Sequence, residues 1–508
     1  MIGNPFNIVS LFFNAAQEYP TKIAIIDKDK ETTFSEFERD IKDTANYFRY
    51  KGIEKGDRVL IFVPMSIDLY RIVLALFHIG ATAVFLDEWV NVSRMKACCE
   101  VAQCKVFIGS SKARVLSFFL SGLRKIPLNL GIGYSLVPIQ TSEYEDVFES
   151  DTALITFTTG STGVPKAAKR THGFLNAQFN ALFEKIEPTP DDIVMPVLPI
   201  VLLINLGVGC TSVIPDFNAR KPESLKPEKI VAQLTRYGVS RIVSSPFFIK
   251  RMAGYILNTK RTIPTLNKII TGGAPVFPSE AGLYISAFPA LKIEIVYGST
   301  EAEPISSIDA HLLSKESPNT LKIGLNVGVP DTKTKLRILE IVTGPIVCED
   351  EASLDGMTLS NGIIGEIIVS GAHVLTEYFN NESAHKLNKI VIGHTCWHRT
   401  GDSGYLNEQG VLFLTGRCSS LIYSNGKCIA PFMYENFFQS IYGVEMGTIL
   451  EVDKKLIAVI ELKKGAFKKD VLFKMNGADV SFDEVRFLTK IPRDPRHNSK
   501  IDYAKIKV

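Results

Sequence analysis

The sequence predicts an α/β protein. A large N-terminal domain of stacked, mainly parallel sheets with a small β-rich subdomain precedes a small, mobile α+β domain. Three observations support this fold class. Through about the first 415 residues, short β-branched runs alternate with longer amphipathic stretches, as in βαβ units. Residues from about 330 to 415 are typical of a smaller, antiparallel sheet. The remaining segment is short and basic.

The expected elements follow in chain order. Residues 58–63 predict a strand, and residues 67–79 predict a helix because their apolar side chains recur at helical spacing. Further buried strands are expected at 105–108, 154–157, 241–243, 268–270 and 293–296. The smaller sheet is expected to contain 335–339, 365–370 and 410–414.

A domain boundary is expected where the polar stretch 416–420 follows a strand, which divides the chain into 1–417 and 418–508. Residues 421–508 contain 15 Lys and Arg and 11 Asp and Glu, a net charge of +4, whereas the preceding 420 residues sum to −1. This net positive charge suggests that the small C-terminal segment is a cap domain that contacts an anionic ligand. Surface charge that serves solubility is an equally weighted alternative.

Composition excludes several classes of protein. The 508 residues are 46% hydrophobic and 22% charged, which is globular composition and not that of a disordered or collagen-like chain. The net charge of +3 indicates neither a nucleic-acid binder nor a membrane-surface binder. Eight cysteines without a CxxC motif favour a reduced, cytoplasmic setting.

Two segments bear on targeting and membranes. The N-terminal residues lack a basic stretch before an apolar run, so no signal peptide is expected. Residues 194–215 are uncharged and long enough to span a bilayer. However, Pro196, Pro199, Gly207 and Gly209 make a poor membrane helix, so a buried strand, loop and helix of an α/β core is the favoured interpretation. No integral membrane association is expected.

The strongest local signal is a loop rich in Gly, Ser and Thr that directly follows the strand at 154–157. Glycines let the backbone approach a ligand, and hydroxyl and N–H groups can surround phosphate oxygens. It is not a Walker A loop, because Val and Pro separate its second glycine from the lysine. The candidate phosphate-binding residues are Thr158, Thr159, Gly160, Ser161, Thr162, Gly163 and Lys166.

This loop resembles the phosphate loop of the adenylate-forming superfamily, which includes acyl-CoA synthetases, luciferases and peptide-synthetase adenylation domains. Other motifs of that superfamily occur in its order, so the resemblance covers nearly the whole chain. They are Thr33–Phe37, 52–61, 80–87, Gly272-Gly273-Ala274-Pro275, Tyr297-Gly298-Ser299-Thr300-Glu301, Thr400-Gly401-Asp402, Gly416-Arg417 and Lys500.

The resemblance implies a role for each of these residues. Glu301 would hold Mg²⁺, since hard cations prefer carboxylate oxygens. Thr300 would bind the AMP phosphate, and Tyr297 would stack on adenine beside Gly272–Pro275, Gly298 and Ser299. Asp402 would accept the ribose hydroxyls. Arg417 precedes the hinge, and Lys500 would bridge the attacking carboxylate and the ribose-phosphate oxygens.

The expected function is therefore ATP-dependent, AMP-forming activation of a carboxylic acid, with a fatty acyl substrate. Coenzyme A is a candidate co-substrate, and an acyl carrier protein is a candidate acceptor. Motifs at 171–178, 211–216, 297–307 and 496–500 resemble one branch, the β-lactone synthetases of bacterial olefin biosynthesis. Those enzymes are usually labelled fatty-acid CoA ligases, and they close a ring on a 3-hydroxy acid without coenzyme A. A non-catalytic relative that binds nucleotide or acyl groups is the alternative of another class.

Several positions depart from the superfamily pattern. Ser419 stands at the hinge, Asn498 and Ser499 precede Lys500, and the basic lobe is short. These departures bear on the thioester-forming step more than on adenylation. The apolar residues 194–213 with Phe247 and Phe248 could house an alkyl chain or form plain core.

Several histidines and cysteines could be metal ligands, but structural roles are the favoured interpretation. His394, Cys396 and His398 alternate along a strand, but that spacing strains a tetrahedral zinc site. Cys98, Cys99 and Cys104 are expected to fill a buried helix, and His172 is expected to support the phosphate loop.

Overall fold

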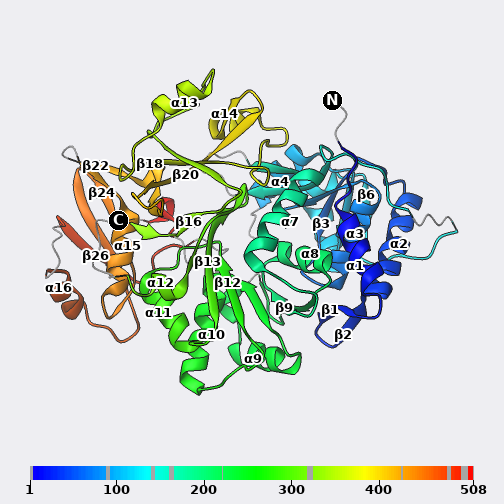
Figure 1. The fold of residues 1–508 in the computed structure, drawn as a ribbon, viewed down its shortest axis with the longest axis horizontal. Helices are drawn as coiled ribbons and strands as arrows, with labels where there is room; N and C mark the ends of the chain where they lie inside the picture. Colours follow the sequence, from blue (N-terminus) through cyan, green and yellow to red (C-terminus); the bar gives the residue numbers. More distant parts are fainter. Residues whose placement is uncertain are drawn as a thin grey trace.

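The computed structural model describes residues 4–86, 92–138, 143–158, 165–219, 221–316, 324–424, 427–476, 482–493 and 501–506. Within these ranges the strands form two large, mainly parallel sheets of nine and six strands, a six-stranded antiparallel sheet, a two-stranded ribbon and a three-stranded sheet near the C-terminus. Figure 1 shows the C-terminal strands at one end of the molecule and the N-terminal helices at the other. The predicted α/β class, with its large and small parts, is confirmed.

The first large sheet has the order β6-β5-β3-β4-β7-β8, and its strands are parallel except β8. In β3, Val59 and Ile61 face one core cluster while Leu60 faces another, so both faces are covered. This explains the unbroken apolar run that predicted the strand. The strands are β3 (Arg58–Phe62), β4 (Thr82–Phe85), β5 (Val106–Gly109), β6 (Leu128–Leu130), β7 (Thr152–Thr158) and β8 (Lys166–Thr171). The helices that accompany this sheet in the chain are α2 (Phe34–Tyr50), α3 (Ile67–His78), α4 (Val92–Ala102), α5 (Ser111–Phe119) and α6 (Ser121–Arg124).

The second large sheet has nine strands in the order β16-β14-β13-β12-β11-β9-β10-β1-β2. Its central strands are parallel, and β2, β14 and β16 pair antiparallel. The strands are β1 (Ile23–Asp27), β2 (Lys30–Thr33), β9 (Ile193–Pro196), β10 (Thr211–Ile214), β11 (Arg241–Ser244), β12 (Lys268–Gly272), β13 (Lys292–Ser299), β14 (Ala302–Asp309) and β16 (Val329–Pro330). The helices are α1 (Val9–Glu18), α7 (His172–Ile186), α8 (Pro199–Val208), α9 (Pro227–Arg236), α10 (Pro246–Thr259), α11 (Pro278–Ala287) and α12 (Ala310–Leu313).

The sheet that the sequence predicts as the smaller one, and that keeps this name below, is antiparallel as predicted, with the order β15-β21-β20-β18-β17 and β19 paired to β20. With six strands it equals the first large sheet in number and is smaller only than the nine-stranded sheet. Its elements are β15 (Leu325–Asn326), β17 (Lys335–Leu339), α13 (Glu351–Met357), β18 (Gly365–Ser370), α14 (Glu382–Asn388), β19 (Lys389–Ile392), β20 (Thr395–Leu406) and β21 (Leu412–Arg417). The C-terminal elements are β22 (Ile422–Ser424), β23 (Lys427–Ile429), α15 (Pro431–Ser440), β24 (Val444–Val452), β25 (Lys455–Leu462), α16 (Lys468–Asn476) and β26 (Glu484–Leu488).

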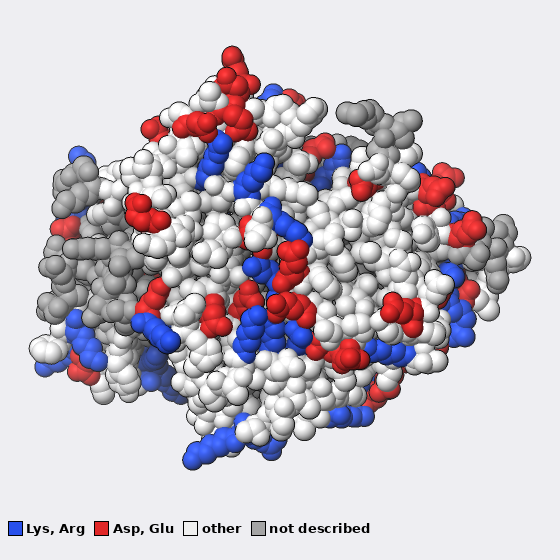
Figure 2. Space-filling view, in the orientation of Figure 1, with Lys and Arg blue, Asp and Glu red and all other residues white. Residues whose placement is uncertain are grey.

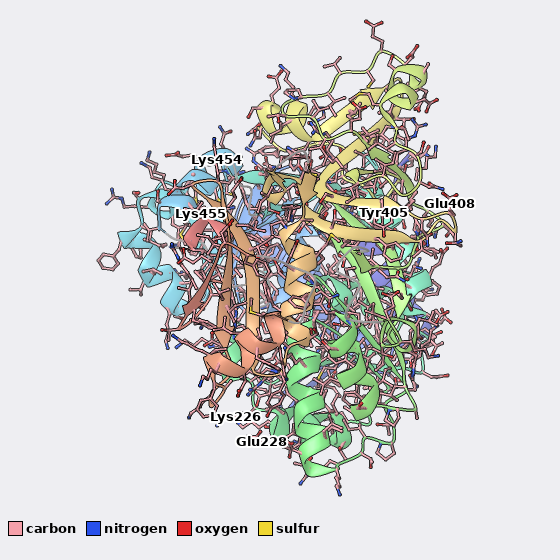
Figure 3. All side chains as sticks on the ribbon, turned by 90° about the vertical axis from the view of Figure 1, so that its left-hand side faces the viewer. Lys226, Glu228, Tyr405, Glu408, Lys454 and Lys455 are labelled. Carbon is pink, nitrogen blue, oxygen red and sulfur yellow. The ribbon has the colours of Figure 1, made fainter. Side chains whose placement is uncertain are left out.

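The surface carries both signs of charge. On the face in Figure 2, Lys and Arg side chains are interspersed with Asp and Glu near its centre. Figure 3 turns the molecule so that the C-terminal strands face the viewer, with Lys454 and Lys455 where β24 meets β25. Asp453 and Lys454 both have positive φ, as a tight hairpin turn requires.

The uncharged segment 194–215 forms part of the core. It contains most of β9, all of α8 and β10, and Val194, Leu202 and Val213 are fully buried. Phe248 is also buried, in the cluster that contains Val213. The core interpretation is thus correct for these side chains. Among the described helices, none is both long enough and apolar enough to cross a bilayer.

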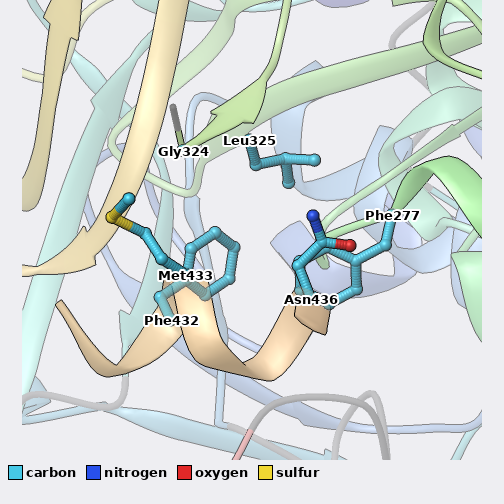
Figure 4. A pocket seen from close by; sticks show the side chains of 6 residues that line it. All are labelled: Phe277, Gly324, Leu325, Phe432, Met433 and Asn436. Carbon is cyan, nitrogen blue, oxygen red and sulfur yellow. The ribbon is translucent and has the colours of Figure 1, made fainter. Parts of the chain in front are cut away.

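The C-terminal elements contact the large part of the chain through α15. The ring of Phe432 on α15 lies 5.4 Å from that of Phe277, and both line a depression with Gly324, Leu325, Met433 and Asn436 (Figure 4). Gly416 makes this approach possible. Its φ is +122°, and a Cβ atom there would lie 2.8 Å from the Cβ of Phe432.

The cysteine prediction is correct only in part. Cys98 is buried in α4 and Cys99 is half-buried there, but Cys104 lies beyond the end of that helix, in the turn before β5. The helix ends at Ala102, and Gln103 has a positive φ, so the chain has already turned before Cys104.

Candidate active site

Two of the predicted nucleotide-binding segments leave the same edge of the second large sheet. Strands β12 and β13 are parallel, with Gly272 opposite Val296. The segment Gly272–Pro275 therefore begins beside Tyr297, the residue that follows Val296. Ligands of open α/β sheets bind outside the carboxyl ends of the strands, which is where both segments lie.

Asp402 and Arg417 join this edge from the smaller sheet. They are direct partners in the pairing of β20 with β21, and Arg417 Nε lies 3.1 Å from Asp402 Oδ1. The hydroxyl of Tyr297 donates to Asp402 Oδ2 at 2.7 Å. Burial raises the pKa of Tyr297 well above its usual value, and the Asp402 charge raises the pKa of Arg417. Both carboxylate oxygens of Asp402 thus have fixed partners.

The turn that carries Asp402 rests on a buried ion pair. Gly401 has a φ of +70°, and the N–H of Gly401 donates to Glu366 Oε1 at 3.3 Å. Glu366 pairs with Arg399 at 2.6 Å, and their side chains are only 4% and 8% exposed. Arg399 also donates to the carbonyl of Val342 at 2.8 Å.

Glu301 lies in the turn between β13 and β14. Its N–H donates to Ser299 Oγ at 3.2 Å, and the hydroxyl of Tyr378 donates to its Oε1 at 3.3 Å. The preceding carbonyl, that of Thr300, accepts from the buried Arg170 at 3.0 Å. This turn is therefore tied to β8 on one side and to Tyr378 on the other.

Lys166 is the first residue of β8 and pairs in register with Thr158, the last residue of β7. Its ammonium donates to Asn388 Oδ1 at 2.9 Å and lies 5.9 Å from the ring centroid of Tyr378. Burial lowers the pKa of Lys166, the carboxylate of Glu301 opposes that shift, and the cation of Arg417 adds to it. The charges of all three residues thus act on one another.

Some of the predicted residues lie outside the described residues. They are Thr159, Gly160, Ser161, Thr162, Gly163 and Lys500, together with the side chain of Thr158. The strands that flank the loop place its two ends side by side, at the mouth of the β7–β8 pair.

A second lysine, Lys389, lies behind Tyr378 and was not expected from the sequence. Its side chain is buried, its ammonium donates to the carbonyl of Leu375, and it lies 5.3 Å from the ring centroid of Tyr378. Burial lowers the pKa of Lys389 to about 8. The ring of Tyr378 therefore contacts both lysines while its hydroxyl holds Glu301. No motif marks Arg170, Tyr378 or Lys389, because their roles depend on contacts between strands distant in sequence.

Two histidines have structural surroundings. His398 lies opposite Lys389 in the pairing of β19 with β20, and burial lowers its pKa well below the usual range. Within the described ranges, no three His, Cys, Asp or Glu side chains converge as a metal site. His172 is buried, burial lowers its pKa to about 4, and its Nδ1 accepts from the N–H of Ile8 at 3.1 Å. That bond ties the start of α7 to the N-terminal segment.

The arrangement suits an anionic ligand that carries a hydrated divalent cation. Lys166, Arg170 and Arg417 supply fixed positive charge around one carboxylate, Glu301, and a second, Asp402, lies beside Arg417. Mg²⁺ is commonly held by one or two carboxylates together with the phosphates of a substrate. Glu301 fits that pattern.

The chain resembles known proteins along most of its length. Relatives include olefin beta-lactone synthetases of Stenotrophomonas maltophilia and Xanthomonas campestris. The first is 27% identical over 90% of this chain and 87% of its own length. The second is 26% identical over 99% of this chain and 97% of its own length. A putative acyl–CoA ligase of Bacillus subtilis is 25% identical over 83% of this chain and 81% of its own length.

Solved structures share the fold. The O-succinylbenzoate coenzyme A synthetase of Bacillus subtilis in complex with AMP has a TM-score of 0.80, covering 98% of both chains at 21% identity. ATP-bound MatB of Rhodopseudomonas palustris also gives 0.80, over 98% of this chain and 97% of its own, at 20% identity. A family model described as AMP-binding enzyme matches residues 12–379. The chain therefore belongs to the AMP-binding enzyme family and is an AMP-forming acid ligase.

Proposed function

We propose that the protein activates a fatty carboxylic acid with ATP and Mg²⁺, releasing pyrophosphate and forming an acyl-adenylate. The observation that carries this is the contact of Tyr378 with both Lys166 and Glu301. The ion pair of Arg417 with Asp402, which Tyr297 joins at the carboxyl end of β13, adds a second cation. Phosphate oxygens gain charge as pyrophosphate leaves, so fixed cations in a partly buried site stabilise the transition state.

In this reaction an oxygen of the substrate carboxylate attacks the α-phosphorus, and the bond from that phosphorus to the bridging oxygen breaks. Glu301 would hold the Mg²⁺, which neutralises charge on the phosphates. Thr300 would bind the α-phosphate, and Asp402 would accept the ribose hydroxyls in place of its present partners. Lys500 would bridge the attacking carboxylate and the ribose-phosphate oxygens.

The remaining nucleotide contacts are proposed on the same basis. Thr158–Gly163 with Lys166 would surround the phosphates. Gly272, Gly273, Ala274 and Pro275, together with Tyr297, Gly298 and Ser299, would enclose the adenine. Tyr297 donates to Asp402, so it would position the ribose-binding carboxylate as well as contact the base.

For the second step we propose that a 3-hydroxyl on the same substrate attacks the acyl carbon. AMP leaves, a four-membered lactone closes, and the hydroxyl proton passes to a base. Two relatives named olefin beta-lactone synthetase, each matched over nine tenths or more of this chain, support this acceptor. Coenzyme A is the competing acceptor, supported by the relatives named as CoA ligases, and an acyl carrier protein is a third.

The decisive experiment follows pyrophosphate and AMP release with saturated fatty acids and 3-hydroxy fatty acids, each with and without coenzyme A. Turnover confined to 3-hydroxy acids and indifferent to coenzyme A supports lactone closure. Turnover that needs coenzyme A supports thioester formation. Lys166→Gln should lose exchange of pyrophosphate into ATP, whereas Lys169→Gln is the matched control. Lys169 lies on the same strand and pairs with Glu377 at 2.8 Å.

Two further proposals concern organisation and location. We place the domain boundary between Arg417, the last residue of β21, and Cys418, the first of a short 3₁₀ turn that ends at Ser420. A cytoplasmic location is supported by all eight cysteines being free thiols. Limited proteolysis tests the first proposal, because cleavage should be confined to the linker after residue 417.

A further inference from the structure

Helix α5 exposes its large apolar side chains instead of burying them. Val115, Leu116, Phe118 and Phe119 are 61%, 47%, 65% and 80% exposed. The buried face of the same helix consists of small residues, Ala113 and Ser117. A surface helix normally has the opposite arrangement, with its apolar stripe toward the core.

The inverted orientation is held by specific bonds. Ser117 Oγ donates to the carbonyl of Arg114 at 2.7 Å and accepts from Asn129 Nδ2 at 2.9 Å. Arg114 Nε donates to Asn129 Oδ1 at 3.0 Å. Both bonds to Asn129 tie α5 to β6, so the helix cannot turn its aromatic side chains inward without breaking them.

Basic residues accompany these apolar side chains on α5 and on the adjoining α6. Lys112 and Arg114 lie on α5, and Arg124 and Lys125 lie at the end of the adjoining α6; all four are exposed. None of them has an ion pair with another described residue. From residue 101 to residue 142 the sequence contains no Asp or Glu at all. The net charge of +3 for the whole chain conceals this local excess.

These eight residues form what we call the α5 surface. The pale-blue helices of this part of the chain lie at an outer edge of the molecule in Figure 3. The α5 surface differs from the face in Figure 2, where the two signs of charge are interspersed. None of its residues belongs to the candidate active site.

We propose that the α5 surface docks the enzyme onto an anionic lipid bilayer. The α5 surface combines exposed apolar side chains with lysines and arginines, and a bilayer surface combines an apolar boundary with anionic headgroups. The apolar groups enter the boundary between headgroups and acyl chains, and the cations approach the anionic headgroups. A nucleic acid duplex would use the cations but leave Phe118 and Phe119 in water. With nine residues, α5 lies in the interface and does not cross it.

The test is co-sedimentation of the full chain with vesicles. We expect binding to vesicles of equal parts phosphatidylcholine and phosphatidylglycerol, and little binding to phosphatidylcholine alone. Phe118→Glu/Phe119→Glu should lower the partition coefficient about tenfold or more, because both rings lose their apolar contact. Lys112→Gln/Arg124→Gln/Lys125→Gln should weaken binding and reduce its sensitivity to salt.

A matched control tests whether exposed apolar residues outside the α5 surface also contribute to vesicle binding. Leu312→Glu/Val347→Glu makes the same change in charge at two other exposed apolar positions, 61% and 88% exposed, and should bind as the unaltered protein does. Exchange of pyrophosphate into ATP with a soluble acid should be unchanged in every variant.

Three results would overturn the proposal. The first is no binding to anionic vesicles, or equal binding by the Phe118→Glu/Phe119→Glu variant. The second is binding that disappears only in Phe467→Glu/Phe473→Glu, which would assign the membrane contact to the C-terminal part. The third is self-association in solution that Phe118→Glu/Phe119→Glu abolishes, without vesicle binding, which would make this face a contact between copies.

Discussion

Removing the cation of Arg399 should destabilise the smaller sheet and the turn that holds Asp402. In Arg399→Met, Glu366 would remain 3% exposed with no counter-charge. Breaking a buried pair by removing one partner costs about 3–5 kcal/mol. The carbonyl of Val342 would lose its donor as well.

The expected shift in the thermal midpoint follows from the size of the chain. Unfolding entropy near the midpoint is about 2.1 cal/mol/K per residue, so 508 residues give about 1 kcal/mol/K. A loss of about 3–5 kcal/mol then lowers the midpoint by about 3–5 °C if the chain unfolds as one unit. If a smaller unit unfolds separately, the shift is larger.

The assay is thermal unfolding followed by fluorescence, with two comparison variants. Arg486→Met breaks an exposed pair, with side chains 36% and 43% exposed, and should shift the midpoint by less than about 1 °C. Glu366→Gln/Arg399→Met should recover part of the loss because no charge remains buried alone. If Arg399→Met shifts the midpoint no further than Arg486→Met does, the buried pair does not support this sheet.

Three other predictions address the active site. Tyr378→Phe removes the hydroxyl that holds Glu301, so half-maximal pyrophosphate exchange should need up to about tenfold more Mg²⁺. The control Tyr405→Phe should leave the Mg²⁺ requirement unchanged. An unaltered Mg²⁺ requirement in Tyr378→Phe would refute the proposal that Tyr378 orients Glu301. Lys389 has a pKa lowered from 10.5 to about 8, so its buried charge costs stability below pH 8. Between pH 8 and 10.5 the unfolded chain holds a proton that the folded protein has lost, so stability relative to Lys389→Met should rise by about 1.4 kcal/mol per pH unit. Lys386→Met is the control. If the difference in unfolding free energy between the unaltered protein and Lys389→Met stays constant with pH, the assignment of a lowered pKa to Lys389 is wrong. Lys500→Ala should abolish adenylate formation while calorimetry still detects ATP binding; full activity would remove the lysine from the mechanism.

The strands predicted from the sequence are mostly short apolar runs, whereas the polar strand β8 was not predicted. Val59, Leu60 and Ile61 all point into core, so the run alone identified β3. The same reasoning separated the uncharged segment 194–215 from a membrane helix, since its prolines and glycines fall at the ends of β9, α8 and β10.

The support for the active site could not be predicted, because it depends on pairing between distant strands. Nothing in the sequence brings Tyr378 to Glu301 or places Lys389 behind the same ring. The bond from Tyr297 to Asp402 joins two sheets, 105 residues apart in the chain. Motifs identify groups that meet a ligand, whereas groups that hold those side chains in place are found only once the sheets are assembled. The excess of basic residues around α5 was missed because the net charge is a sum over the whole chain.

If Asp402 binds ribose as we propose, its ion pair with Arg417 links nucleotide binding thermodynamically to the conformation of the chain after β21. Arg417 is the last residue of β21, and its ion pair must rearrange if ribose is to occupy Asp402. A nucleotide that rearranges this ion pair therefore also changes which conformation is favoured in the chain that follows Arg417. By reciprocity, an orientation of the C-terminal part that strains Arg417 must change nucleotide affinity by the same factor. On the same basis we expect variants at Phe432, on α15, to change the dissociation constant of ATP.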